Sequence, residues 1–192
     1  QVNKKMKAGV DEAGRGPLAG PVFAAAVILD ETIKIDGLND SKKISETKRL
    51  ELADEIKLKA ISWSVQSCSA LEIDEMNILK ATLKAMKKAI EGLCSRPKLV
   101  LVDGLHSPEI NVPVRTIVKG DQSEKTIMAA SILAKVHRDQ YMKEVDILYP
   151  NYGFKHHKGY PTKIHLEALK SYGITKEHRL TFKPVRDIYD AN

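Results

Sequence analysis

The amino-acid sequence predicts an α/β fold with a mixed central sheet and a helical C-terminal extension. Short apolar runs alternate along the chain with longer stretches whose apolar residues recur at helical spacing. No internal repeat, low-complexity segment or linker interrupts the 192 residues, so a single domain is expected. Strands that alternate with helices are typical of the α/β class.

The N-terminal part is expected to form two strands and a helix. Residues 6–10 form a short apolar run, and "PVFAAAVIL" (21–29) is predicted to be a buried strand that follows a glycine-rich turn. The stretch "SETKRLELADEIKLKA" (45–60) is a predicted helix, because Ser45 is a residue type that favours the N-cap position.

The middle of the chain adds a strand and an amphipathic helix. In "ISWSVQ" (61–66) every second residue is apolar, which is the pattern of a half-buried strand. Leu79, Leu83, Met86 and Ile90 then recur at helical spacing, and Gly92 is expected to end that helix.

Two further strands and two further helices complete the prediction. "KLVLVD" (98–103) and "VRTIVKGD" (114–121) are short apolar strands that each end in an acid. A long helix is expected over residues 123–148, where Pro150 stops it. The last clear helix is 162–171, with Thr162 as its cap and Gly173 after its end.

Composition and charge exclude some classes of protein. No apolar stretch approaches the roughly 20 residues that span a bilayer, and no signal peptide is visible, although the chain opens on Gln1 and a missing leader is left open. Cys68 and Cys94 lack the spacing of a metal site, which favours two isolated thiols in an intracellular core over a disulfide.

The positive charge is concentrated near the C-terminus. The net charge is +6, and residues 150–192 carry eight Lys or Arg against four Asp or Glu. We expect a core of residues 1–149 and a helical, basic region of residues 150–192. Such a region suits a polyanionic partner, with a solvated surface as the alternative.

Carboxylates follow three predicted strands. Asp11 and Glu12 follow the first, and Asp103 and Asp121 end two later ones. Strand ends are where ligands gather in α/β sheets, so these acids are expected to converge, with Glu12 just past its strand end. Clustered carboxylates repel unless a cation neutralises them, and oxygen ligands select Mg²⁺ or Mn²⁺. The alternative is ordinary caps, turn residues and surface acids.

The glycine-flanked Arg15 has a use beside such acids. Gly14 and Gly16 let the backbone approach a ligand closely and direct its N–H groups at a sugar or phosphate, while Arg15 adds a planar donor fork. A turn that needs glycine only for its conformation is the alternative. The pattern indicates acids that hold metal and glycines that admit a nucleic-acid backbone.

The chain resembles the bacterial ribonuclease HII family, the type 2 ribonucleases H. The matching stretches run in order from residue 9 to residue 185: "VDEAGRGPLAGPV", "GLNDSKKIS", "IDEMNILKATLKAM", "LVLVDG", "VKGDQSEKTIMAASILAKVHRD", "YPNYGFKHHKGYPTKIHLEAL" and "HRLTFKPV". The resemblance implies a ribonuclease H-like fold. It also implies hydrolysis of RNA in RNA–DNA hybrids and at single ribonucleotides embedded in duplex DNA, leaving 3′-hydroxyl and 5′-phosphate ends.

The resemblance also implies roles for individual residues. It places the metal-binding, catalytic acids on Asp11, Glu12, Asp103 and Asp121, which are expected to hold two Mg²⁺ or Mn²⁺ ions. The substrate-binding residues that we expect are Gly14, Arg15, Gly16 and Tyr160. From the basic stretch "DSKK" (40–43) we also expect Lys42 and Lys43 to lie near phosphate, with a solvated loop as the alternative. Gly14, Arg15 and Gly16 are associated with the 2′-hydroxyl at the RNA–DNA junction, and Tyr160 with substrate sensing. A cytoplasmic monomer without a membrane partner is expected.

Two questions stay open at this stage. The C-terminal His156, His157 and His165 could suggest zinc, but a basic strip interleaved with Tyr152, Phe154 and Tyr160 is better suited to contact nucleic acid. The rival functions are a DNA junction resolvase or transposase-type nuclease, and a hybrid-binding module without catalysis. Cleavage of pure DNA would favour the first rival, and loss of an acid would favour the second.

Overall fold

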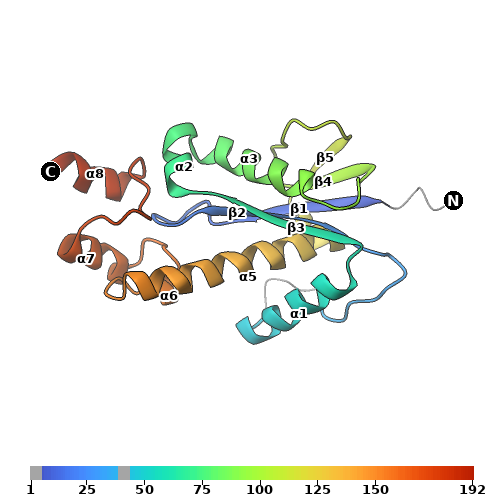
Figure 1. Cartoon of the computed structure of the whole chain (residues 1–192), viewed down its shortest axis with the longest axis horizontal. Coiled ribbons are helices and arrows are strands. Elements are labelled where there is room, and N and C mark those ends of the chain that lie inside the picture. Colours follow the sequence, from blue (N-terminus) through green and yellow to red (C-terminus); the bar gives the residue numbers. More distant parts are fainter. Residues whose placement is uncertain (1–5, 39–43) are drawn as a thin grey trace.

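A five-stranded mixed sheet forms the centre of the protein. The computed structural model describes residues 6–38 and 44–192. Figure 1 shows the strands in the spatial order β3-β2-β1-β4-β5. The strands are β1 (Lys7–Ala13), β2 (Val22–Ile28), β3 (Ser62–Cys68), β4 (Leu99–Asp103) and β5 (Val114–Ile117). The first three pair antiparallel, whereas β1, β4 and β5 pair parallel, which confirms the predicted mixed sheet.

Helices cover both faces of this sheet. Figure 1 shows α2 (Ala70–Met76) and α3 (Ile78–Glu91) on one face, with α1 (Glu46–Lys59) and α5 (Lys125–Leu148) on the other. Within the described residues, none of the helices combines the length and the apolar character required to cross a membrane.

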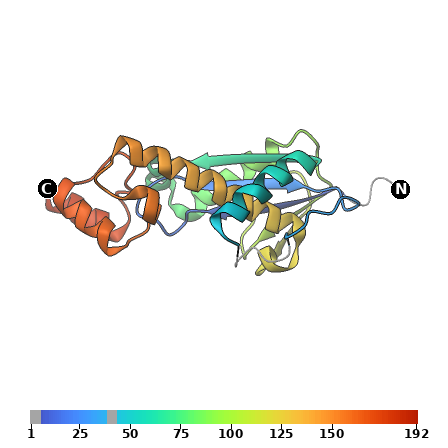
Figure 2. The same cartoon turned by 90° about the horizontal axis from the view of Figure 1, so that it is seen from below.

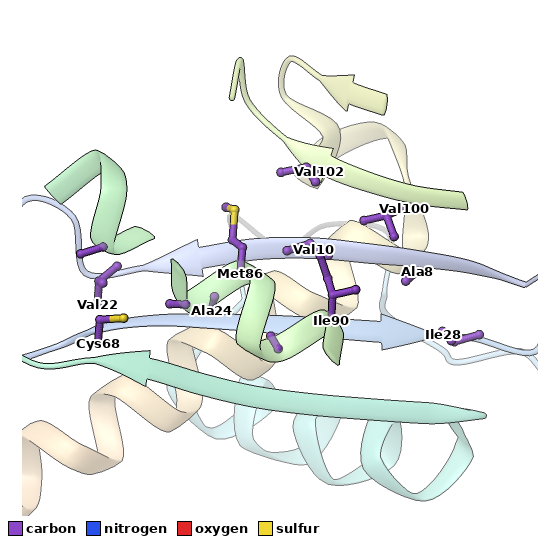
Figure 3. Packing of buried hydrophobic residues seen from close by; sticks show 14 of the residues in the cluster. Ala8, Val10, Val22, Ala24, Ile28, Cys68, Met86, Ile90, Val100 and Val102 are labelled. Atoms are coloured by element: carbon purple, nitrogen blue, oxygen red, sulfur yellow. The ribbon is translucent and has the colours of Figure 1, made fainter. Parts of the chain in front are cut away.

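The alanine run of β2 is explained by this two-sided burial. Ala24 and Ala26 pack toward α3 with Val10 and Met86. Figure 3 shows Val10 of β1, Ala24 of β2 and Met86 of α3 close together in this cluster. Ala25 and Val27 pack on the opposite face, toward α5. Helix α5 also lies close against β1, because a Cβ at Gly9 would stand 2.1 Å from the Thr126 carbonyl carbon. Small residues therefore hold α5 tightly against the strand that carries Asp11 and Glu12.

Several boundaries differ from the prediction. Strand β1 continues to Ala13, because its pairing with β2 extends that far. Strand β5 ends at Ile117, and the left-handed Lys119 (φ 55°) leads into the short helix α4 (Gly120–Ser123). Extended Glu124 then separates α4 from α5, so the long helix begins at Lys125. The capping by Ser45 and Thr162 is confirmed.

Three helices follow α5 at the end of the molecule opposite the N-terminus (Figures 1 and 2). They are α6 (Phe154–His157), α7 (Lys163–Tyr172) and α8 (Lys183–Ala191), of which only α7 was predicted. The two thiols are free, as expected, but only Cys68 lies in the core, since Cys94 is exposed.

Two buried arginines attach this helical region to the loop of residues 14–21, called here the glycine loop. Arg179 donates from Nε to Gly20 O (2.9 Å), from Nη1 to Arg15 O (3.0 Å) and from Nη2 to Gly14 O (2.6 Å). Each nitrogen of its guanidinium group thus donates to a backbone carbonyl. Burial lowers the pKa of Arg179 to about 9, so the carbonyl dipoles replace solvent around this cation.

Arg138 of α5 links the glycine loop to a second segment. Its Nε donates to Pro21 O (3.0 Å) and its Nη2 to Ala19 O (2.8 Å), while Nη1 donates to Lys158 O (2.7 Å). Burial lowers the pKa of Arg138 to about 10. One guanidinium therefore fixes the spacing between the glycine loop and the segment just before Tyr160.

Three C-terminal histidines are buried and neutral. The Thr175 N–H donates to His178 Nδ1 (3.0 Å), so His178 carries its proton on Nε2 and donates to His165 Nε2 (2.8 Å). His165 in turn donates from Nδ1 to the Tyr160 carbonyl (2.9 Å). His157 accepts from the Gly159 N–H at Nδ1 and donates from Nε2 to the Tyr152 carbonyl. Every nitrogen of these rings is engaged, which excludes them as zinc ligands in this arrangement.

The prediction that Tyr152, Phe154 and Tyr160 contact nucleic acid is wrong for Tyr152 and Phe154. Tyr152 and Phe154 are buried and stacked, with ring centroids 5.3 Å apart, and the Tyr152 hydroxyl donates to Gly173 O. They pack in the core because their neighbours His157 and His165 complete an aromatic cluster around them. Tyr160 alone of the three is exposed.

The arginine contacts predict a large loss of stability in Arg179→Met. The substitution leaves the carbonyls of Gly14, Arg15 and Gly20 without their donor, and each buried unsatisfied acceptor costs about 1–3 kcal/mol. We expect a decrease of at least about 3 kcal/mol in the free energy of unfolding, measured by urea titration. The matched control, Arg186→Met on the exposed side of α8, should change little. Equal losses in the two variants would contradict the anchoring role.

Because these histidines are buried in neutral form, we expect the folded protein to lose stability in acid. The loss should begin at pH values above those at which most carboxylates become protonated. Burial lowers the pKa of His165 to about 4 and that of His178 to about 3, against about 6.5 in an unfolded chain. Their contribution is present above pH 6.5 and is lost as pH falls toward 4, because only the unfolded state binds these protons. The free energy of unfolding should decrease by up to about 1.4 kcal/mol per pH unit for each histidine. His178→Phe should flatten the dependence, and the exposed His156→Gln should retain the wild-type curve. A wild-type stability that stays constant from pH 7 to 5 would show that these rings are not buried in neutral form.

Candidate active site

The four predicted acids lie together at one end of the sheet. Val10 of β1 is level with Val102 of β4 in a parallel pair, so Asp11 and Asp103 are the next residues of adjacent strands. Asp121 stands in α4 rather than at a strand end, and its backbone N–H donates to Asp103 Oδ1 (3.3 Å). Three separate segments therefore supply what we call the acid cluster, made up of Asp11, Glu12, Asp103 and Asp121.

Glu12 is not placed where it was expected. Both acids belong to β1, with Asp11 level with Ala25 and Glu12 level with Ala24, so the expectation that Glu12 lies just past the strand end is wrong. Their contact is nonetheless direct, because the Glu12 N–H donates to Asp11 Oδ1 (2.8 Å) and the two carboxyl groups interact.

The charges of the acid cluster repel one another in a partly dry environment. Burial raises the pKa of Asp11 well above its usual value, and the charges of Glu12 and Asp103 raise it further. Burial also raises the pKa of Glu12, although the charge of Arg15, 3.8 Å away, opposes the shift. The pKa of Asp103 is raised by burial and by the charge of Asp121, against the backbone N–H groups of Asp121 and Gly120. A cation held by these groups would favour their charged forms.

The donors of the acid cluster fit a hard divalent ion. Glu12 Oε2 is buried and accepts no hydrogen bond, and it is an oxygen ligand of the kind that Mg²⁺ and Mn²⁺ prefer. Among residues 6–38 and 44–192, however, no group of three or more His, Cys, Asp or Glu side chains is arranged so that it could hold a metal ion. The acid cluster therefore supplies suitable donor atoms, but these atoms do not have the geometry of a complete metal site.

A hollow of about 390 Å³ opens beside the acids, and we call it the Glu12 hollow. Six of the predicted site residues line it: Glu12, Gly14, Arg15, Gly16, Asp121 and Tyr160. Asp11 and Asp103 are not among its lining residues. Lys42 and Lys43 lie outside the described residues.

The glycines of the hollow serve two different purposes. Gly14 has a φ of +94°, and a Cβ there would stand 2.1 Å from Arg138 Nε, so the position admits only glycine beside the buried guanidinium. A Cβ at Gly16 would meet Tyr160 Cε1 at 3.5 Å, which places the tyrosine ring beside Gly16. Gly14 therefore shapes the loop, and Gly16 lies next to the ring.

Three polar lining residues were not predicted: Arg49 of α1, and Ser131 and Lys135 of α5. Ser131 and Lys135 are four residues apart, so a shared helix face could have been predicted. Nothing in the sequence showed that this face, or that of Arg49, borders the acids. The approach of α1 and α5 to this end of the sheet brings them there.

Two comparisons of the sequence with known proteins point to the same family. The sequence profile of the family described as "Ribonuclease HII" matches residues 8–185. The chain is 58% identical to Ribonuclease HII of Vibrio parahaemolyticus serotype O3:K6 (strain RIMD 2210633) over 182 residues, which covers 95% of this chain and 86% of that protein.

Two solved structures resemble the fold. The crystal structure of the ribonuclease H2 from Pyrococcus horikoshii OT3 superimposes with a TM-score of 0.81 at 28% identity, covering 96% of this chain and 97% of the other. Bst-RNase HIII, solved in complex with Mn²⁺, has a TM-score of 0.77 at 16% identity, covering all of this chain and 71% of the other. Profile, sequence identity and fold agree over nearly the whole length. The chain belongs to the ribonuclease HII family.

Proposed function

We propose that this ribonuclease, which as a family member hydrolyses the RNA strand of RNA–DNA hybrids, also cuts duplex DNA on the 5′ side of a single embedded ribonucleotide. The products would carry 3′-hydroxyl and 5′-phosphate ends. One observation carries the proposal: the lining of a single hollow includes the acids Glu12 and Asp121 as well as Gly14, Arg15, Gly16 and Tyr160. Chemistry and recognition of one nucleotide therefore share one space.

The acid cluster would hold two Mg²⁺ or Mn²⁺ ions. When bound, such ions supply Lewis-acid activation of the attacking water and stabilise the leaving 3′-oxygen. The protein contributes the oxygen donors and a partly water-excluded site, in which electrostatic attraction to the ions is stronger than in water. It also fixes the direction from which the nucleic-acid strand approaches. Arg15, 3.8 Å from Glu12, balances part of the negative charge before any cation arrives.

Gly14, Arg15, Gly16 and Tyr160, called here the recognition wall, are suited to test for a 2′-hydroxyl, the group that separates RNA from DNA at one nucleotide. The carbonyls of Gly14 and Arg15 are held by Arg179, so the loop presents a fixed backbone to the sugar. The Tyr160 backbone is held as well, since its N–H donates to His157 O and its carbonyl accepts from His165. Its ring remains 43% exposed and available to stack on a sugar or base.

The decisive experiment compares three duplexes that differ only in sugar chemistry: all DNA, DNA with one ribonucleotide, and an RNA–DNA hybrid. We expect cleavage of the second and third with Mg²⁺ or Mn²⁺, and none with EDTA. Cleavage of the all-DNA duplex would favour a resolvase-type nuclease instead. A monomeric state and a cytoplasmic location stay predictions.

Asp11→Asn should abolish cleavage and leave the fold intact. The substitution removes one donor charge at similar volume, so the ions lose a ligand. It also relieves repulsion within the acid cluster, so thermal stability in EDTA should hold or rise. Cleavage rates in Mg²⁺ and in Mn²⁺, together with thermal unfolding in EDTA, test both statements. Turnover near that of the wild type would refute the metal-site assignment.

Tyr160→Ala should separate recognition from cutting. Loss of a stacked ring costs roughly 1–3 kcal/mol. The loss should fall mainly on the isolated ribonucleotide, because a long hybrid offers many registers and a single junction offers one. Cleavage of both substrates is compared for Tyr160→Ala and for the control Tyr189→Ala, an exposed tyrosine of α8. An equal loss on both substrates would remove Tyr160 from the recognition role.

A further inference from the structure

The Glu12 hollow is lined by groups of both charges. Its lining includes the acids Glu12 and Asp121, the cations Arg49 of α1 and Lys135 of α5, and the hydroxyl of Ser131 of α5. Neither Arg49, Ser131 nor Lys135 has a task in the chemistry described above. A nucleic-acid strand that enters the hollow brings phosphates that the acids repel and these cations attract.

Lys135 is oriented before any ligand binds. Its Nζ donates to Asp139 Oδ1 (2.9 Å), one helical turn further along α5, and Asp139 is buried. The ammonium has three donors, so N–H groups remain for an anion in the hollow. Ser131 stands one turn before Lys135, and the two side chains share a helix face that borders the hollow.

Toward the residues that the structure describes, Arg49 makes a single hydrogen bond, which leaves most of its guanidinium donors available. Its Nη2 donates to the Ile44 carbonyl (3.2 Å), which fixes the side chain at the start of α1. The nearby acids already have other partners: Glu46 accepts from Lys143 (2.8 Å), and Asp139 accepts from Lys135. A planar fork in this state suits bidentate contact with a phosphate.

The size of the hollow indicates which strand supplies that phosphate. A volume of about 390 Å³ is near the lower end of the range for small-ligand sites, so it admits part of one strand rather than two. The same space holds the acids and the Gly16–Tyr160 pair, which act on the strand that contains the ribonucleotide. The cations therefore face a phosphate of that same strand.

We infer that Arg49, Ser131 and Lys135 form a binding site for a backbone phosphate next to the scissile one in the cleaved strand. The inference rests on the proposed function, because it takes the acid side of the hollow as the place of cleavage. The site would hold the strand in register while the neighbouring linkage is cut. It would act on every substrate alike, since phosphates carry no sequence information.

Binding at different salt concentrations gives the first test. Arg49→Gln and Lys135→Gln are compared with Lys87→Gln, an exposed lysine of α3 on the other face of the sheet. A DNA duplex with one ribonucleotide is bound in EDTA, where no cleavage occurs. Arg49→Gln and Lys135→Gln should each bind the duplex about tenfold or more weakly than the wild type. Each should also reduce the slope of log K against log salt by about one unit. Lys87→Gln should match the wild type, and Arg49→Lys should retain the slope because it retains the charge.

A scan with neutral linkages gives the second and sharper test. Single methylphosphonates replace the phosphates one at a time, in the cleaved strand and then in its complement. One linkage beside the cleavage site should weaken wild-type binding and have no further effect in Arg49→Gln, since the contact is already lost. Losses that simply add at every linkage, or coupling found only in the complementary strand, would overturn the inference.

The outcomes separate this inference from the proposed function. If the wild type leaves the ribonucleotide duplex uncut, the proposed function fails. If the wild type cuts it, while both hollow variants retain the wild-type salt slope, only the phosphate site fails. Circular dichroism of each variant confirms folding, and the glutamine of Lys135→Gln can still donate to Asp139.

Discussion

The glycine loop exists in its observed form because two buried guanidiniums satisfy its carbonyls. Five of the six hydrogen bonds from Arg138 and Arg179 end on residues 14–21, and the sixth ends on Lys158. A loop of this kind would otherwise need water at each carbonyl, and water would then compete for the hollow. The carbonyl contacts also explain why Arg138 and Arg179 can be buried without a carboxylate partner. Their pKa values stay at about 10 and about 9, so both guanidinium groups remain charged near neutral pH. The recognition wall of the site depends on this exchange of solvent for guanidinium.

The same contacts make the C-terminal region part of the site rather than an appendage. Leu18 of the glycine loop packs with Leu169 and Val185 from the C-terminal helices, and Ala19 forms a β-bridge with His178. Asp74 of α2 accepts from the backbone N–H groups of Leu180 and Thr181, which ties this region to the helix layer on the other side. Residues from both ends of the sequence therefore enclose one hollow.

Much of the fold and the convergence of the acids could be predicted, because both follow from local patterns. Alternating strands and helices indicate the sheet, and acids after parallel strands meet at one edge. The predictions that were wrong concern positions that depend on contacts between residues far apart in the sequence. Glu12 lies inside β1 because pairing with β2 continues to Ala13, and Asp121 lies in α4 because the chain turns at Lys119.

It was harder to predict from the sequence which polar and aromatic side chains are buried. Arg138 and Arg179 are of a residue type that is almost always exposed, and only the carbonyls of a distant loop make their burial tolerable. Tyr152 and Phe154 stand in a basic stretch, yet they pack beneath it against histidines. Arg49, Ser131 and Lys135 likewise reach the hollow only through the packing of α1 and α5. None of these placements follows from spacing along the chain.

Arg138 has one further consequence, which concerns shape rather than charge. Its side chain bonds to the glycine loop on one side and to Lys158, two residues before Tyr160, on the other. The spacing between the glycine loop and the backbone just before Tyr160 is therefore set by one guanidinium group, and it cannot change without breaking these hydrogen bonds. A binding surface whose parts are held at a fixed spacing loses little conformational freedom on binding. The adjustment then falls on the duplex, whose backbone must deform to present one sugar, and the ease of that deformation depends on the base steps around it.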